Sequence, residues 1–158
     1  MNILVLCTGN SARSIIAEVL FTELGRPCGV RGHSAGSDPR GEPHPMALTV
    51  LEAHGHDTSG LASKRWDVFA RPDAPVMQAV VTVCDSAAAE TYPVWPGAPV
   101  QAHWGLADPA AVTEESRQRE AFNATYQALR TRVEAFLKSD WRADDPVSLR
   151  NALEAAHA

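Results

Sequence analysis

Cys7 and Arg13 bracket a short polar loop that has the residue types needed to bind and attack an oxyanion. The loop contains Gly9 and Asn10, which accept unusual backbone angles and so let successive N–H groups converge on one point. A helix that follows the loop adds unpaired N–H groups and the positive end of its dipole. The guanidinium of Arg13 adds a planar fork of donors for a tetrahedral oxyanion. The positive charge of Arg13 and the helix dipole also lower the pKa of a nearby thiol. The loop therefore predicts that Cys7 is a thiolate nucleophile.

The segments around this loop predict one α/β domain. Runs typical of strands occupy 3–7, 29–35, 79–84 and 100–104, and helical spacing is expected in 13–25, 45–55, 63–69, 114–138 and from 145 onward. Strands that alternate with helices predict a single-domain, four-stranded parallel sheet with helices on both faces, in the flavodoxin-like style. The domain is expected to span 1–140, with a C-terminal helical extension over 141–158.

Polar side chains follow three of the four expected strands. The first strand runs into Cys7, the third ends at Cys84 and Asp85, and the fourth leads through His103 to Asp108. Ligands of parallel sheets bind at the carboxyl ends of the strands. These groups are therefore expected to converge on one rim of the sheet.

Composition narrows the classes of partner and the compartment. The chain has 158 residues, 45% of them hydrophobic, and a net charge of -5 with no basic cluster, which argues against nucleic acid or a membrane surface as the main partner. Three irregularly spaced cysteines do not form a disulfide framework and indicate a reducing compartment. No stretch is long enough to span a bilayer, and the N-terminus lacks the charged region of a signal peptide. The expected location is the cytoplasm.

The Cys7 loop resembles the phosphate-binding loop of the low-molecular-weight protein tyrosine phosphatases and of the arsenate reductases built on the same fold. The resemblance covers nearly all of 1–137 and includes Cys7, Gly9, Asn10, Arg13 and Ser14 in order. It implies a small oxyanion ligand (arsenate, with phosphate or sulfate as analogues) held by Thr8, Gly9, Asn10, Ser11, Ala12, Arg13 and Ser14. Ser11 and Ser14 are near enough in sequence to donate hydrogen bonds to the thiolate, and helix capping is the alternative role for either.

Asp108 is the candidate general acid. It precedes Pro109 and follows the last expected strand, where the resembled family has an Asp-Pro that protonates the leaving oxygen. A carboxylic acid above the anion site can protonate a departing hydroxide or alkoxide, both of which are otherwise poor leaving groups. An Asp-Pro pair is also common in turns, so the pair alone does not indicate a general acid. Its position after the last expected strand favours that role.

Cys84 is the candidate second thiol. In the arsenate reductase branch, a cysteine matching Cys84 attacks the arsenylated nucleophile, and another cysteine further along takes over the disulfide. Here 85–92 contains no cysteine, Tyr92 stands where the last thiol would be, and Ala12 replaces the second cysteine of the loop. The three-cysteine relay therefore cannot run as in its best-known members. Cys84 is alternatively a small buried hydrophobe, and Cys28 is expected to be inert.

The resemblance also implies a cation. Asn10, Glu18, Ser34 and Asp67 match positions that bind potassium in some arsenate reductases of this fold. Ordinary hydrogen bonds that fix loops are the alternative role for these side chains. No other metal and no bound redox cofactor are expected.

The favoured interpretation is arsenate reduction coupled to thiol oxidation through a covalent Cys7–arsenic adduct. The resolving thiol is either Cys84 or a small-molecule thiol such as glutathione or mycothiol, and electrons come from glutaredoxin–glutathione, mycoredoxin–mycothiol or thioredoxin. The alternative is a phosphotyrosine phosphatase, in which water resolves a cysteinyl phosphate. Phosphatases of this fold usually place aromatic residues after the Asp-Pro, whereas Ala110 and Ala111 follow here.

Overall fold

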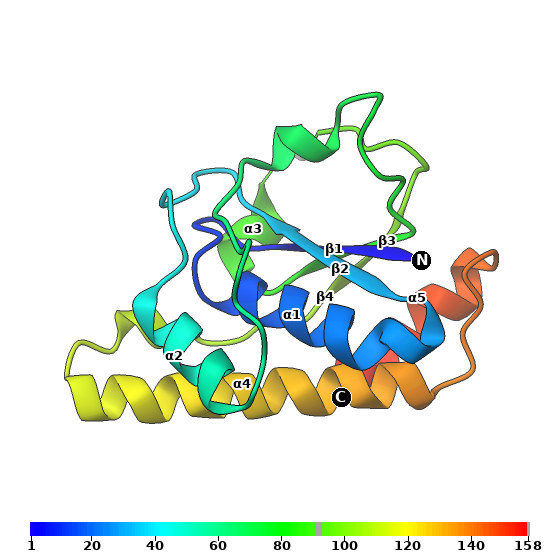
Figure 1. Cartoon of the computed structure of the whole chain (residues 1–158). Helices are drawn as coiled ribbons and strands as arrows, with labels where there is room; N and C mark the ends of the chain where they lie inside the picture. The colour runs from blue at the N-terminus through cyan, green and yellow to red at the C-terminus, as the bar shows by residue number, and fades with distance from the viewer. Residues whose placement is uncertain (91–92, 158) are drawn as a thin grey trace.

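A four-stranded parallel sheet forms the centre of the molecule, in the order β2-β1-β3-β4 (Figure 1). The structure is a computed structural model that describes residues 1–90 and 93–157. The strands are β1 (Asn2–Leu6), β2 (Arg31–Ala35), β3 (Ala79–Thr82) and β4 (Val100–His103). The central strands β1 and β3 are buried along almost their whole length, as their apolar sequences require. The edge strand β4 alternates buried and exposed residues. The predicted sheet is confirmed.

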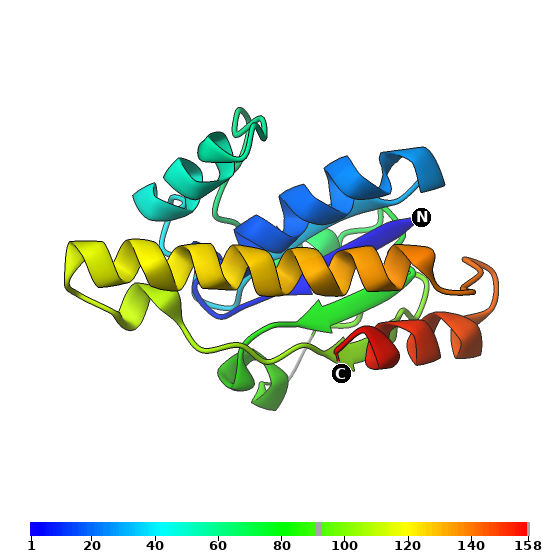
Figure 2. The same ribbon diagram turned by 90° about the horizontal axis from the view of Figure 1, so that it is seen from below.

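Four longer helices pack below this sheet in the view of Figure 1, and Figure 2 shows α4 lying between α1 and α5. They are α1 (Arg13–Gly25), α2 (Pro45–Ala53), α4 (Glu115–Lys138) and α5 (Pro146–His157). Shorter helical segments are η1 (Arg26–Cys28), η2 (Trp66–Phe69), α3 (Asp85–Ala89) and η3 (Pro109–Ala111). None of the described helices combines the length and apolar character needed to cross a bilayer.

The C-terminal segment shares the core of the domain. The ring of Trp104 stacks on Phe21 of α1 at 5.5 Å, and its indole N–H donates to the carbonyl of Leu153 in α5 at 2.8 Å. Leu149 and Leu153 are fully buried. Residues 146–157 therefore cover β4 and α4 as a packed layer.

The face opposite α1 and α4 carries a shorter helical segment than the sequence predicts. The face opposite α1 and α4 is covered by the short η2 and by loops (Figure 1), where Phe69 packs against His33 of β2. The helix expected over 63–69 is reduced to Trp66–Phe69. The reason is that the backbone of Arg65 forms a parallel bridge with Gly36 before the turn begins. Prolines 72 and 75 then prevent a longer helix.

Candidate active site

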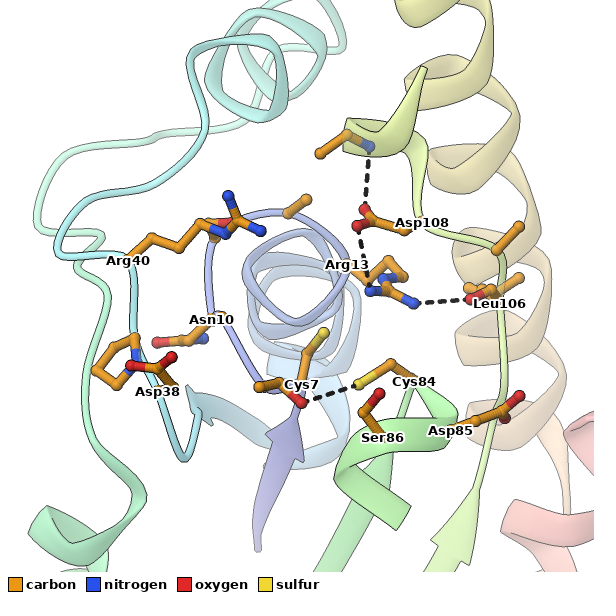
Figure 3. A pocket seen from close by; sticks show the side chains of 17 residues that line it. Cys7, Asn10, Arg13, Asp38, Arg40, Cys84, Asp85, Ser86, Leu106 and Asp108 are labelled. Carbon is orange, nitrogen blue, oxygen red and sulfur yellow. Dashed lines mark hydrogen bonds and ion pairs between the residues drawn. The ribbon is translucent and has the colours of Figure 1, made fainter. Parts of the chain in front are cut away.

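The segment after β1 forms a curved loop around the N-terminus of α1, at the carboxyl rim of the sheet (Figure 3). A pocket of about 630 Å³ opens above it. Its lining combines the three predicted strand ends with a fourth segment, the loop after β2: Cys7 to Arg13, Asp38, Pro39, Arg40, Cys84, Asp85, Ser86, Leu106, Ala107, Asp108 and Ala110. The predicted convergence of the three strand ends, which carry Cys7, Cys84 and Asp108, is confirmed.

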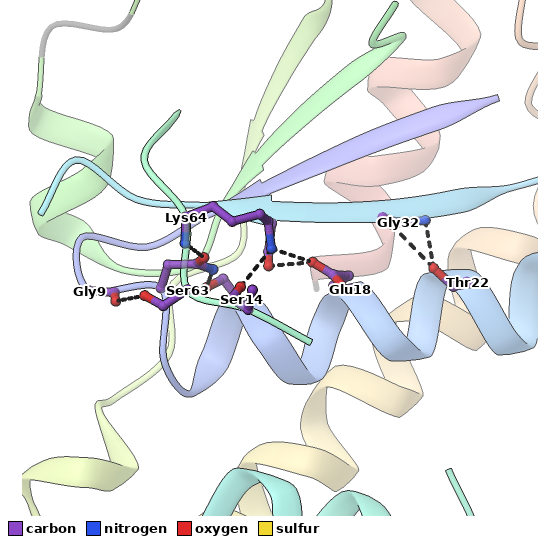
Figure 4. Close-up of polar contacts among 10 residues, drawn as sticks. Gly9, Ser14, Glu18, Thr22, Gly32, Ser63 and Lys64 are labelled. Atoms are coloured by element: carbon purple, nitrogen blue, oxygen red, sulfur yellow. Dashed lines mark hydrogen bonds and ion pairs between the residues drawn. The ribbon is translucent and has the colours of Figure 1, made fainter. Parts of the chain in front are cut away.

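Asn10 holds the loop in its curved shape. Its φ of 41° lies in the left-handed region, and its side chain is fully buried. The amide Nδ2 donates to Ser14 Oγ at 2.8 Å, and Oδ1 accepts the backbone N–H of Lys64 at 2.8 Å. The neighbouring Ser63 also holds the loop, because its Oγ donates to the carbonyl of Gly9 at 3.2 Å (Figure 4). The loop is therefore preorganised by a distant segment.

The first turn of α1 is left open toward the pocket. Its N-cap is Ala12, and no side chain caps the helix, so neither Ser11 nor Ser14 takes the capping role that was one alternative. Since Ser14 Oγ accepts from Asn10, its own proton is available for another acceptor. The uncapped N–H groups and the helix dipole thus face the position where an oxyanion would lie.

Arg13 is the strongest indication that the loop binds an anion. Its side chain is only 11% exposed; Nη1 donates to the carbonyl of Leu106 at 2.8 Å, and Nη2 lies 3.8 Å from Asp108 Oδ2. Its Nε is buried without a hydrogen-bond partner among the described residues. A buried donor without a partner is costly, about 1–3 kcal/mol or more when charged. An oxyanion in the loop would satisfy it.

Asp108 lies above the loop at the start of η3. Its Oδ1 accepts the N–H of Ala110 at 3.0 Å, which fixes the carboxyl group. Its Oδ2 faces Arg13, and the side chain is 37% exposed. This places one carboxyl oxygen over the pocket, where it can reach both substrate and solvent.

Cys84 is at the N-cap of α3, a helix that the sequence analysis missed because five residues show no periodicity. Its sulfur accepts the N–H of Ala87 at 3.4 Å and lies 3.8 Å from the hydroxyl of Thr8. Thr8 in turn donates to Glu90 at 3.0 Å. Both Cys84 and Cys7 are buried in the floor of the pocket.

The two thiols interact with each other, and this changes which sulfur ionises first. The hydrogen bond with Cys7 lowers the pKa of Cys84 to about 5. The same hydrogen bond, together with burial, raises the pKa of Cys7 and outweighs the opposing charge of Arg13. The interaction between the two thiols thus favours ionisation of Cys84 over ionisation of Cys7. The expected lowering of the Cys7 pKa treated that residue alone and is wrong for this pocket.

The residues expected to bind potassium are only partly brought together. Ser34 Oγ donates to Glu18 Oε1 at 2.5 Å. Lys64 Nζ lies 3.5 Å from the same oxygen, and Figure 4 shows Lys64 beside Glu18. Lys64 Nζ also donates to the carbonyl of Ala62 at 2.7 Å. Asp67 is paired with Arg65 instead. A lysine ammonium thus supplies the positive charge beside Glu18, and the residues present do not fit a potassium ion.

Three further residues differ in their relation to the pocket. Cys28 is exposed at the end of η1 and does not line the pocket. Tyr92 lies outside the described residues. Arg40 was missed because its loop has no regular pattern; only its charge, close in sequence to the end of the second strand, could have pointed to it.

The fold and pocket define a family. The low molecular weight phosphotyrosine protein phosphatase family matches residues 2–145, and the chain belongs to it. An arsenate reductase of Bacillus subtilis is 34% identical over 134 residues, covering 84% of this chain and 89% of that protein. Arsenate reductase 1 of Staphylococcus epidermidis is also 34% identical over 134 residues, covering 81% and 94%.

Solved structures show the same architecture. An arsenate reductase in its phosphate-binding state superposes with a TM-score of 0.69 at 26% identity, covering 86% of this chain and 95% of that one. A low molecular weight protein tyrosine phosphatase from T. tengcongensis superposes with a TM-score of 0.66 at 21% identity, covering 85% and 95%. The second likeness concerns the fold alone.

Proposed function

We propose that this protein reduces arsenate to arsenite at the expense of thiols. The observation that carries the proposal is that a second buried cysteine, Cys84, lines the floor of the oxyanion pocket together with Cys7. Phosphoester hydrolysis needs one sulfur as nucleophile, whereas reduction needs two thiols to supply two electrons. The arsenate reductase names of its relatives support the same choice.

The proposed first step is attack on arsenate. The oxyanion binds to the open N–H groups of the loop and to Arg13, whose Nε is without a partner. The bound anion faces Cys7, and the Cys7 proton can pass to the Cys84 thiolate as Cys7 attacks. A Cys7–arsenic bond forms, an arsenic–oxygen bond breaks, and protonated Asp108 donates a proton so that the oxygen leaves as water.

The second step transfers the electrons. A second thiolate attacks the Cys7 sulfur, a disulfide forms, and the sulfur–arsenic bond breaks with its electron pair remaining on arsenic. Arsenic passes from the pentavalent to the trivalent state and leaves as arsenite. The second thiolate is either Cys84 or an external thiol such as glutathione or mycothiol. We favour the external thiol because no cysteine in 85–92 can carry a Cys7–Cys84 disulfide out of the pocket.

The compartment and partners follow from this chemistry. All three cysteines are unpaired, as suits a reducing environment such as the cytoplasm. The reductant of the oxidised enzyme is a glutaredoxin-like protein with its thiol, and mycoredoxin–mycothiol and thioredoxin are the competing systems.

A phosphatase is the second candidate function, because Arg13 and Asp108 form the geometry that ester hydrolysis also uses. Ala110 lines the pocket wall where a ring-stacking residue would be expected. The small side chain favours an inorganic oxyanion over an aryl phosphate.

The deciding experiment compares arsenite release with hydrolysis of an aryl phosphate. Each of the three reducing systems is supplied separately, and Cys7→Ser serves as the blank. Thiol-dependent arsenite release is the expected result. Rapid ester hydrolysis with no arsenite from any reductant would overturn the proposal and leave the phosphatase.

A further inference from the structure

The pocket is much larger than the oxyanion that its floor binds. Its volume of about 630 Å³ lies within the range of about 300–1,000 Å³ that holds ligands of drug size. A tetrahedral oxyanion is comparable with a few water molecules, each of about 30 Å³. The loop and Arg13 occupy the floor, so the wall above them is available to a second molecule. The following inference rests on the proposed function and concerns the identity of that molecule.

Asp38 and Arg40 form the wall opposite Asp108 (Figure 3). The backbone N–H of Asp38 donates to the carbonyl of Thr8 at 3.0 Å, and that of Arg40 donates to the carbonyl of Gly9 at 3.0 Å. Pro39 between them restricts the backbone further. The wall is therefore fixed directly to the oxyanion loop, and its position relative to Cys7 is built into the fold.

The close approach of Arg40 explains the glycine in the loop. A Cβ on Gly9 would lie 3.1 Å from Nε of Arg40 and 3.3 Å from its Cγ, closer than ordinary van der Waals contact. A side chain at this position would require the Arg40 stem to shift by a few tenths of an ångström. Gly9 thus lets the second arginine lie against the loop.

The charged groups on this wall are available to bind a ligand. Arg13, the other arginine of the pocket, is engaged with Leu106 and Asp108. Within the described part of the chain, the guanidinium of Arg40 and the carboxylate of Asp38 have neither an ion-pair nor a side-chain hydrogen-bond partner. A guanidinium and a carboxylate that line the same pocket are charge-complementary to the α-carboxylate and the α-ammonium of an amino acid.

We propose that Arg40 and Asp38 bind the amino-acid end of the thiol that resolves the Cys7–arsenic adduct. Arg40 takes the α-carboxylate and Asp38 the α-ammonium, as in the γ-glutamyl end of glutathione, while the thiolate reaches the Cys7 sulfur below. The step forms a mixed disulfide between Cys7 and the small thiol, breaks the sulfur–arsenic bond, and leaves the electron pair on arsenic. A thiol without an α-carboxylate and an α-ammonium cannot make these contacts with Arg40 and Asp38.

The test measures arsenite release as kcat/KM for each thiol. Glutathione is compared with its dimethyl ester, which lacks the carboxylates, and with N-acetylcysteamine, which lacks both charges. The variants are Arg40→Gln and Asp38→Asn, and Arg150→Gln in α5 is the matched control because it is exposed and does not line the pocket. The oxidised enzyme is analysed by mass spectrometry for a glutathione adduct on Cys7.

We expect Arg40→Gln to lower kcat/KM for glutathione by about tenfold, the usual effect of losing a charge-assisted hydrogen bond. Asp38→Asn should act in the same direction. Neither variant should change kcat/KM for N-acetylcysteamine by more than about twofold, and the dimethyl ester should bring wild type to the level of Arg40→Gln. Arg150→Gln should match wild type throughout.

Two results would count against the assignment, and they are distinguishable. Equal use of glutathione and its dimethyl ester by wild type, with normal arsenite release, overturns the role of Arg40 and leaves the proposed function intact. If no thiol gives arsenite while Arg40→Gln impairs hydrolysis of acidic phosphopeptides, both proposals fall and the wall belongs to a phosphatase.

Discussion

Arg13 and Asp108 are joined through two contacts from one guanidinium. Nη2 of Arg13 lies 3.8 Å from Asp108 Oδ2, and Nη1 donates at 2.8 Å to the carbonyl of Leu106, two residues before the acid. The residue that binds the oxyanion therefore also fixes the loop that carries the candidate acid. Binding and proton donation cannot be altered independently at this position.

Arg13→Lys should weaken oxyanion binding and slow turnover together. A lysine presents a point charge that cannot span two oxygens and hold Leu106 as well. The loss should be about 3 kcal/mol in transition-state stabilisation, roughly a hundredfold in kcat/KM. Steady-state kinetics with arsenate and calorimetric binding of sulfate measure the two effects. Asp108→Asn is the control, since it should slow turnover but leave sulfate binding largely intact; wild-type kinetics in Arg13→Lys would remove Arg13 from the mechanism.

Cys7→Ser should abolish arsenate reduction and any phosphatase side activity. A hydroxyl group is a far weaker nucleophile at neutral pH than a thiolate. Sulfate binding should persist, because the loop N–H groups and Arg13 remain. Turnover that survives the substitution would mean that the loop only binds the anion and that chemistry takes place elsewhere.

Local sequence was sufficient to predict the nucleophile loop and the strands around it. Cys7, Arg13 and the strand before them are contiguous, and the carboxyl ends of parallel strands must share one rim. Asp108 could be placed because it follows the last strand after only four intervening residues. These predictions needed no information about how distant loops pack.

The residues that the sequence missed act across long separations. Lys64 holds Asn10 through its backbone N–H, 54 residues away, and Arg40 lies against Gly9 from a loop without periodicity. The direction of the Cys7 pKa was wrong for the same reason. Only the folded chain brings Cys84 close to the thiol of Cys7. There Cys84 raises the pKa of Cys7 by more than the charge of Arg13 lowers it.

Potassium should not change the activity of the wild type, because Lys64 already supplies a positive charge beside Glu18. Lys64→Met should lower the free energy of unfolding by about 1–2 kcal/mol, since it leaves a largely buried carboxylate with less compensation. Urea denaturation measures this loss, and arsenite release is followed with potassium or sodium chloride at equal ionic strength. The other lysine of the chain, Lys138, is exposed at the end of α4 and provides the matched Lys138→Met control. Activation of wild type by potassium alone would contradict the assignment.

Cys84→Ala should make Cys7 ionise at lower pH. The pKa of Cys7 is raised first by its hydrogen bond with Cys84 and then by burial, while Arg13 and the N–H of Gly9 lower it. Removing Cys84 eliminates the largest raising contribution, so the thiolate of Cys7 should form over a lower pH range than in wild type. In wild type, the first thiolate should instead form on Cys84 with a midpoint near pH 5, in line with its pKa of about 5.

The pH dependence of alkylation, with peptide mapping of the labelled cysteine, measures both midpoints. Cys28→Ser is used as the background in every variant, so that its exposed thiol does not contribute.

The same Cys84→Ala protein separates the two resolving thiols, because multiple turnover with glutathione should persist if an external thiol resolves the adduct. A wild type that accumulates a Cys7–Cys84 disulfide after one turnover, together with an inactive Cys84→Ala, would assign that step to Cys84. If Cys7 of the wild type is alkylated at lower pH than Cys84, the charge of Arg13 lowers the pKa of Cys7 by more than the interaction with Cys84 raises it.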